Sequence, residues 1–309
     1  ILTIIISDEE VMKEWWRIKG FFLLFCYCFK VKKIILLAVT FFLLNTSVSL
    51  TEEYLSKDPN SINRGKFWGG KALIVNYKKS ELHKHNYRII LDPTGTSPFK
   101  KVESFSPKKG DCGNHKHWGG KSGGVTDCNT GRLRLEVTNS VRLSKRLVKK
   151  KPRERWYGYY VYIPNDFPED QYLQPYINQF YGYNKGTRGG YSPQISASIY
   201  KNKFTVTGGT TIIDEDSLKG RWHKIEYHFK WSVNNDGFIK VYHNSELKLN
   251  RTGFTTMNYD FVEFKYGTYN NRDYGYTYPE NYQFPGHTIY FSGLSVSEKR
   301  EQLKVNNIK

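Results

Sequence analysis

The feature that most constrains the fold of this chain is a succession of short apolar and aromatic runs from residue 67 onward. The runs recur every ~10 residues and are separated by clusters of Gly, Asn, Asp, Pro and Lys. They are Leu133–Val137, Trp156–Ile163, Gln194–Tyr200, Phe204–Thr207, Trp222–Trp231, Phe238–Tyr242, Phe261–Tyr269 and His287–Val296. Because no long stretch has helical period, this rhythm predicts an all-β sandwich or barrel.

One turn in this rhythm carries a specific signal. Asn234-Asn235-Asp236-Gly237 joins two of the runs, and Asp-Gly suits the left-handed backbone positions of a tight turn. We therefore expect Trp222–Trp231 and Phe238–Tyr242 to form a hairpin. The basic segment Lys145–Arg155 lies between two other runs, and it is predicted to be a solvated loop or part of an anion-attracting rim.

The N-terminal 49 residues have a different character from the rest. Three lysines precede the uncharged stretch Ile34–Leu44, and the small residues Ser47 and Ser49 follow it. This order predicts a signal peptide at about 31–49, and a start at Val31 would leave residues 1–30 untranslated. A membrane anchor is the alternative, but the lysines interrupt a span of ~20 residues. We expect a targeting region at 1–49, a single domain at 50–309 and a protein secreted to the extracellular space or periplasm. No stable membrane insertion is expected after signal removal.

The charge of the remaining chain indicates a polyanionic partner. Residues 1–49 hold six basic and four acidic side chains, so the remainder carries 41 basic and 25 acidic residues, a net charge of +16. Such an excess attracts nucleic acid, an anionic membrane surface or an acidic glycan. Tyrosine is abundant, with 24 residues, and its flat ring suits stacking against sugars or bases. Export favours the acidic glycan over nucleic acid.

Two cysteines of the predicted domain are expected to pair. Cys112 and Cys128 are its only cysteines, and an oxidising compartment favours a disulfide between them. A zinc site that uses His115 and His117 is the alternative, although the spacing matches no common zinc pattern.

Three segments place polar side chains where packing alone does not require them. Alternation puts Arg132, Arg134 and Glu136 on one face of a strand, opposite three apolar residues. In the same way Gln179 and Tyr181 lie opposite Phe180, and Lys265, Gly267 and Tyr269 share a face. A bend or bulge at Gly267 would bring the tips of Lys265 and Tyr269 together.

These segments resemble the jelly-roll polysaccharide lyases, a group that includes alginate lyases, glucuronan lyases and heparin lyase I. Their Arg-x-Glu-Leu, Gln-x-His and Phe-Lys-x-Gly-x-Tyr-Asn strands are matched by Arg134–Val137, Gln179–Tyr181 and Phe264–Asn270. Further agreement with the glucuronan and heparin lyase-like branch lies around Asp111-Cys112, Asp127-Cys128, Trp156–Gly158, Tyr162–Pro168 and Gly220–His223. The resemblance implies a β-jelly roll, a concanavalin-like sandwich of two antiparallel sheets with a concave cleft, and it spans residues 110–293.

The resemblance implies β-elimination at a uronic acid. Arg134 and Gln179 would neutralise the substrate carboxylate, and Tyr269 would act as acid and as candidate base. Lys265 or Arg134 would lower the phenol pKa of Tyr269. The expected catalytic residues are Arg134, Gln179, Tyr181, Lys265 and Tyr269, and the expected substrate-binding residues are Arg132, Glu136, Tyr183, Asn271 and His117. No cofactor is required, structural calcium is left open because some relatives bind it, and the protein is expected to be a monomer.

One departure from the family pattern divides the functional hypotheses. Tyr181 stands where these lyases carry the His that commonly serves as base. Either tyrosines replace that base, with syn stereochemistry if Tyr269 is both base and acid, or the domain binds an acidic glycan without cutting it. Because Arg134, Glu136, Gln179, Lys265 and Tyr269 are all present, we favour catalysis. Nucleic-acid binding through basic strands and aromatic side chains is a third hypothesis.

Overall fold

The computed structural model describes residues 63–67, 70–74, 85–113, 126–139, 143–184, 193–271 and 277–308. The chain divides into two units, Ile1–Glu52 and Glu53–Lys309, and every described residue belongs to the second. The predicted targeting region and the loop that carries His115 and His117 lie outside the described residues. None of the helices in these ranges is both long and apolar enough to span a membrane.

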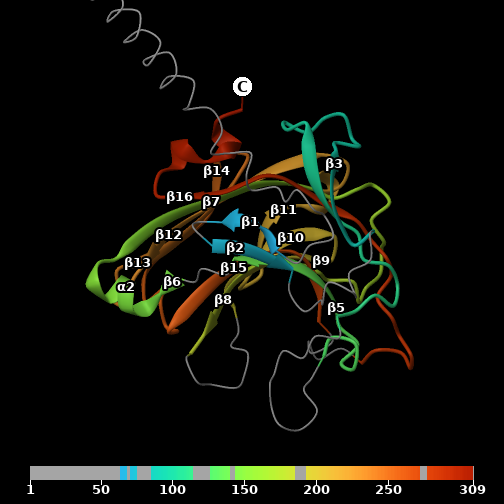
Figure 1. Cartoon of the computed structure of the whole chain (residues 1–309), viewed down its shortest axis with the longest axis horizontal. Coiled ribbons are helices and arrows are strands. Elements are labelled where there is room, and N and C mark those ends of the chain that lie inside the picture. Colours follow the sequence, from blue (N-terminus) through green and yellow to red (C-terminus); the bar gives the residue numbers. More distant parts are fainter. Residues whose placement is uncertain are drawn as a thin grey trace, which may run out of the picture. The chain divides into compact units, whose positions relative to one another are not determined.

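Two antiparallel sheets form the domain within these ranges (Figure 1). The first sheet has the order β1-β2-β5-β15-β8-β9-β10-β11, with β6 also paired to β15. Its strands are β1 (Asn63–Phe67), β2 (Gly70–Ile74), β5 (Leu133–Asn139), β6 (Leu143–Ser144), β8 (Tyr176–Tyr183), β9 (Pro193–Tyr200), β10 (Lys203–Val206), β11 (Thr210–Ile213) and β15 (Phe261–Asn270).

The second sheet has the order β14-β13-β12-β7-β16-β4-β3. Its strands are β3 (Tyr87–Leu91), β4 (Lys101–Phe105), β7 (Arg153–Tyr162), β12 (Trp222–Trp231), β13 (Gly237–His243), β14 (Glu246–Phe254) and β16 (Ile289–Ser297). The chain passes repeatedly from one sheet to the other, as between β4 and β5, β7 and β8, β11 and β12, and β14 and β15. This two-sheet arrangement is a β-sandwich of the jelly-roll type, as predicted.

Helices are short in the described part of the chain. They are α2 (Lys145–Lys150), α3 (Glu215–Leu218) and the 3-10 turns η2 (Arg300–Gln302) and η3 (Lys304–Asn306). The basic segment was predicted to be a loop, but its first part forms helix α2. The Ser144 side chain caps this helix by accepting from the Arg146 amide, and the helix buries its own Val148. The segment Arg153–Arg155 is also not a loop, because it begins β7.

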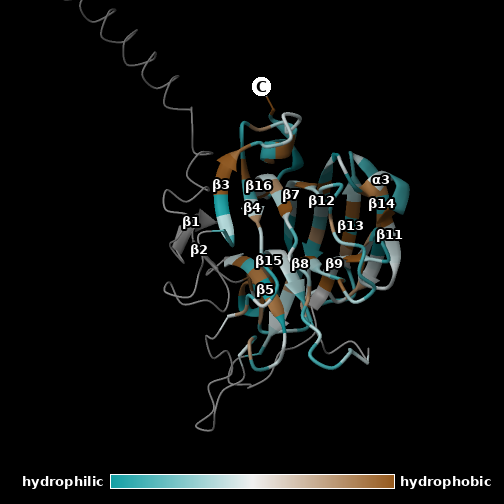
Figure 2. Ribbon diagram, turned by 90° about the vertical axis from the view of Figure 1, so that its right-hand side faces the viewer, coloured by the Kyte–Doolittle hydropathy of each residue, from teal (hydrophilic) through white to brown (hydrophobic). Residues whose placement is uncertain are grey.

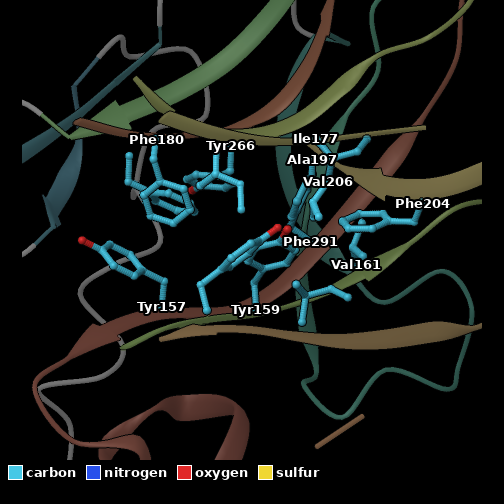
Figure 3. Close-up of a cluster of buried hydrophobic side chains, with 14 of the residues drawn as sticks. Tyr157, Tyr159, Val161, Ile177, Phe180, Ala197, Phe204, Val206, Tyr266 and Phe291 are labelled. Atoms are coloured by element: carbon cyan, nitrogen blue, oxygen red, sulfur yellow. The ribbon is translucent and has the colours of Figure 1, made fainter. Parts of the chain in front are cut away.

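The core lies between the sheets and is built largely from aromatic side chains (Figure 3). Hydropathy varies from residue to residue along the strands (Figure 2), because alternate side chains point to opposite faces. Phe180 of the first sheet packs against Tyr157 and Phe229 of the second, with ring centroids 4.8 and 4.3 Å away. The expected hairpin is present, with β12 and β13 paired from Lys230 opposite Phe238 onward.

Buried polar groups tie the sheets together within this core. The phenols of Tyr159 and Tyr227 both donate to the Asn178 side-chain oxygen, at 2.6 and 2.7 Å. The Tyr87 and Tyr266 hydroxyls likewise donate to one oxygen of the buried Glu103 carboxylate, at 2.6 and 2.7 Å. Because an unpaired buried polar group is costly, these bonds hold β8 and β15 at a defined position over the second sheet.

Candidate active site

Three adjacent strands of the first sheet bring the predicted polar residues together. β15 lies between β5 and β8, with Tyr269 opposite Arg134 and Lys265 opposite Gln179. Leu135 of β5, Phe180 of β8 and Phe264 of β15 point into the core. The side of these strands turned away from the core, called the site face below, therefore carries the polar set. The predicted alternation in all three strands is confirmed.

A bulge in β15 sets the spacing on this face. Tyr266 is opposite Asn178 and Tyr269 is opposite Tyr176, so β15 contains one more residue than β8 over this interval. Gly267 lies inside the bulge with φ of +136°. A Cβ at this position would lie 2.3 Å from the Leu135 carbonyl oxygen, so only glycine fits without movement. The predicted irregularity at Gly267 is confirmed.

Arg134 is the most constrained side chain of the site. Its guanidinium carbon lies 3.9 Å from the centre of the Tyr269 ring, and one terminal nitrogen lies 3.3 Å from the Asp127 carboxylate. The Nε atom is buried and has no hydrogen-bond partner among the described residues. A fixed guanidinium with an unused donor is suited to bind an anionic group that arrives from outside.

Glu136 and Gln179 form a buried pair beside Arg134. The Gln179 amide nitrogen donates to Glu136 Oε1 at 2.6 Å, and the Glu136 side chain is fully buried. Burial raises the pKa of this carboxyl, although Lys265, Arg134 and the Gln179 bond oppose the rise. Glu136 was expected to contact substrate. In this structure it is buried and accepts the hydrogen bond that orients Gln179, and its contact with substrate stays a prediction.

Lys265 lies next to Tyr181 on the site face. Its ammonium nitrogen is 4.1 Å from the centre of the Tyr181 ring and 3.1 Å from a carboxylate oxygen of Glu263. Burial is the largest influence on the Tyr181 phenol and raises its pKa to about 12; Arg134 lowers it, while Glu263 adds to the rise. Tyr181 is therefore a neutral phenol at neutral pH.

Tyr269 corrects one electrostatic expectation. Arg134 and Arg132 do lower the pKa of its phenol, but burial outweighs both and the net pKa lies above its ordinary value. Lys265, which was expected to contribute, is not among the main influences on this pKa. At neutral pH Tyr269 thus carries its proton, which is the form that a general acid requires.

The remaining predicted residues lie at different distances from this centre. Arg132 Nε donates to the Asn271 side-chain oxygen at 3.1 Å, beside the end of β15 that carries Tyr269. Tyr183 pairs with Phe261 at the other end of β15, where their rings stack 5.4 Å apart. His117 lies outside the described residues. The described ranges contain no group of three or more His, Cys, Asp and Glu side chains suited to a metal ion.

Three residues at the site were given no role in the sequence prediction. Asp127 pairs with Arg134, Glu263 pairs with Lys265, and the Tyr176 ring lies 5.7 Å from the Tyr269 ring. Alternation along β15 could have found Glu263, because it lies two residues before Lys265. Asp127 gave only an indirect signal, its position next to Cys128, and the Cys112–Cys128 disulfide predicted there is confirmed.

Comparison with known protein families identifies the family of this chain. A family model described as polysaccharide lyase matches residues 78–295, which contain all of the described strands that form the site. The chain belongs to the polysaccharide lyase family. This assignment confirms the resemblance drawn from the three strand motifs and makes the protein a polysaccharide lyase.

A solved structure shows the same fold at low sequence identity. An endo-β-1,4-glucuronan lyase from the fungus Trichoderma reesei superimposes on this lyase with a TM-score of 0.53 at 14% identity, covering 78% of this chain and 96% of the other. The alginate lyase AlgAT5, of polysaccharide lyase family 7, gives a TM-score of 0.42 at 15% identity, covering 71% and 85%. No curated protein sequence matches this chain.

Proposed function

We propose that this polysaccharide lyase is secreted and cleaves a polymer containing uronic acid by β-elimination. In this reaction the bond between C5 and its hydrogen breaks, a C4–C5 double bond forms and the 4-O-glycosidic oxygen leaves with a proton. The C5 proton is too weakly acidic to leave unless the adjacent carboxylate is neutralised. The site must therefore hold a cation at the carboxylate and a proton-transfer group near C5 and O4.

Arg134 supplies the cation in this proposal, and its geometry is the observation that carries it. The guanidinium is held against the Tyr269 ring at 3.9 Å and keeps a buried Nε donor without a partner. The Gln179 side-chain amide is oriented by its bond to Glu136, and its other N–H supplies a second donor beside Arg134. A uronate carboxylate that bound these donors would bring its C5 and O4 close to the Tyr269 phenol.

Tyr269 is the proposed base and acid. Burial and Glu136 raise the pKa of both phenols. Arg134 and Arg132 both favour the Tyr269 phenolate and Asp127 opposes it, whereas Arg134 favours the Tyr181 phenolate and Glu263 opposes it. Of the two phenols, Tyr269 therefore has the more favourable surroundings for losing a proton to start the reaction. After the original phenol proton has gone to solvent, the Tyr269 phenolate removes the C5 proton, and the phenol so formed passes that proton to O4. Because both transfers occur on one face of the sugar, the elimination is syn. Lys265 and Tyr181 would hold the neighbouring sugar.

The proposed substrate is a β-linked uronan such as glucuronan. Support comes from the net charge of +16 outside residues 1–49 and from the glucuronan lyase whose fold this chain shares. The signal-like segment and the Cys112–Cys128 disulfide support an exported, disulfide-bonded enzyme. We propose that the enzyme acts as a monomer without a cofactor.

An activity screen on acidic polysaccharides tests this function. Purified protein is mixed with glucuronan, alginate and heparin, and the ultraviolet absorbance of the unsaturated uronate product is followed. A rise with at least one polymer, lost in Tyr269→Phe, is expected. Binding of a polymer without any absorbance change, identical in wild type and Tyr269→Phe, would instead identify a non-catalytic glycan-binding domain, the reading that Tyr181 in place of a His favours.

A further inference from the structure

We infer that Asp127, fixed by the Cys112–Cys128 disulfide, is a positioning residue for Arg134, so that full activity requires the oxidised disulfide. This inference rests on the proposed role of Arg134.

The Asp127 carboxylate is fully buried and lies 3.3 Å from a terminal nitrogen of Arg134. The guanidinium is thereby held on one edge by Asp127 and on one face by the Tyr269 ring. Two contacts of different geometry fix the plane of a group that otherwise rotates freely. Without the carboxylate, the guanidinium would keep the ring contact and lose its orientation around it.

The backbone of Asp127 is itself held from two sides. Its amide donates to the Gly113 carbonyl at 3.1 Å, and its carbonyl accepts from the Arg132 amide at 2.9 Å, directly before β5. The Thr126 and Asn129 side chains close the turn by bonding each other's backbone amides, at 3.1 and 2.7 Å. Asp127 is thus part of a rigid turn that leads into the strand carrying Arg134.

The disulfide joins this turn to a second segment. Cys128 follows Asp127 directly, Cys112 precedes Gly113, and the Cα atoms of the two cysteines are 5.0 Å apart. Besides the covalent bond, the Asp127 and Cys128 amides join the two segments by donating to the Gly113 carbonyl, at 3.1 and 3.4 Å. Reduction by a dithiol, which adds two electrons and two protons and yields two thiols, would release the turn that holds the carboxylate.

The first experiment compares Asp127→Asn with a matched control, Glu226→Gln. Glu226 is also a fully buried carboxylate paired with an arginine, Arg300, but it belongs to β12 of the second sheet. Asp127→Asn is expected to lower kcat about 100-fold with KM changed less, while Glu226→Gln keeps kcat within about threefold. Asp127 raises the pKa of Tyr269, so its loss also moves the associated limb of the pH–rate profile to lower pH. A kcat for Asp127→Asn within threefold of wild type would overturn the inference.

The second experiment uses the wild-type protein and applies even if Asp127→Asn does not fold. Dithiol treatment, verified by alkylation and mass measurement, should lower kcat at least tenfold, and reoxidation should restore it. Unchanged kcat in fully reduced, folded protein contradicts the role of the disulfide.

A spectroscopic measurement separates this inference from the proposed function. The Nε–H resonance of Arg134, assigned with Arg134→Lys, should exchange slowly in the oxidised protein and rapidly after reduction. If no uronan is cleaved, the proposed function fails, yet this resonance still decides whether Asp127 and the disulfide hold Arg134. Equal exchange in both redox states refutes the positioning role.

Discussion

Substitution of Gly267 by alanine tests whether the β15 bulge builds the site. A Cβ at Gly267 would lie 2.3 Å from the Leu135 carbonyl oxygen, 2.9 Å from the Phe105 ring and 3.0 Å from the Glu136 Cα. The backbone φ of +136° is also strained for any L-residue. Gly253→Ala is the matched control, because its φ is +78° but nothing lies within 4 Å of the added Cβ.

Two effects lower the free energy of unfolding in these variants, namely the positive φ and the overpacking of the added Cβ. Positive φ costs about 1–2 kcal/mol in either variant, within the range for strained backbone. Overpacking against backbone atoms adds about 1–3 kcal/mol, for Gly267→Ala alone. We therefore expect the free energy of unfolding to fall by roughly 4 kcal/mol in Gly267→Ala and by about 1.5 kcal/mol in Gly253→Ala.

Urea unfolding followed by tryptophan fluorescence measures both losses by linear extrapolation. Lyase activity is assayed at urea concentrations well below the unfolding midpoint of Gly267→Ala. It should fall about 100-fold in that variant, because a shift of ~1 Å between Tyr269 and Arg134 disrupts the reacting geometry. Gly253→Ala should keep wild-type activity. Equal stability losses within about 0.5 kcal/mol, or a fully active Gly267→Ala, would refute the reasoning.

Three further predictions follow from single groups. Tyr269→Phe should lower kcat by about 10³-fold or more while Tyr181→Phe lowers it less; the reverse order, measured by product absorbance, would assign the base to Tyr181. His287 has its pKa lowered to about 4 by burial. Its neutral form therefore stabilises the fold fully above pH ~6.5, and this stabilisation, about 2–3 kcal/mol, is lost as pH falls toward 4. Urea midpoints between pH 7.5 and 4.5 should thus shift less in His287→Gln than in wild type. Replacing Cys112 and Cys128 by serine should lower the free energy of unfolding by ~3 kcal/mol in the same assay; no change would show that the disulfide constrains little.

The fold is predictable from the sequence because strand alternation and turn residues are local properties. Each of the eight runs read from the sequence overlaps a strand, and the Asp236-Gly237 turn leads from β12 into β13 as expected. The first-sheet strands β1, β2 and β11 were not predicted, nor were β3, β4 and β14. Their runs are short, and β14 is largely exposed, so pairing with neighbours rather than hydrophobic pattern defines them.

The sequence by itself determined that this chain is an all-β polysaccharide lyase. It also placed Arg134, Gln179 and Tyr269 on the strand faces opposite the apolar residues, because strand alternation and sequence motifs depend on residue order alone. Only the tertiary structure decided how these groups affect each other. Burial depends on every strand around a side chain. It raises the pKa of Tyr269 although Arg134 lowers it, and it leaves Glu136 with no exposed surface. The pairing of Arg134 with Asp127 likewise arises because the turn beside the disulfide folds back onto β5. The bulge at Gly267 could be suspected from the sequence, but its effect on spacing depends on the register with β8.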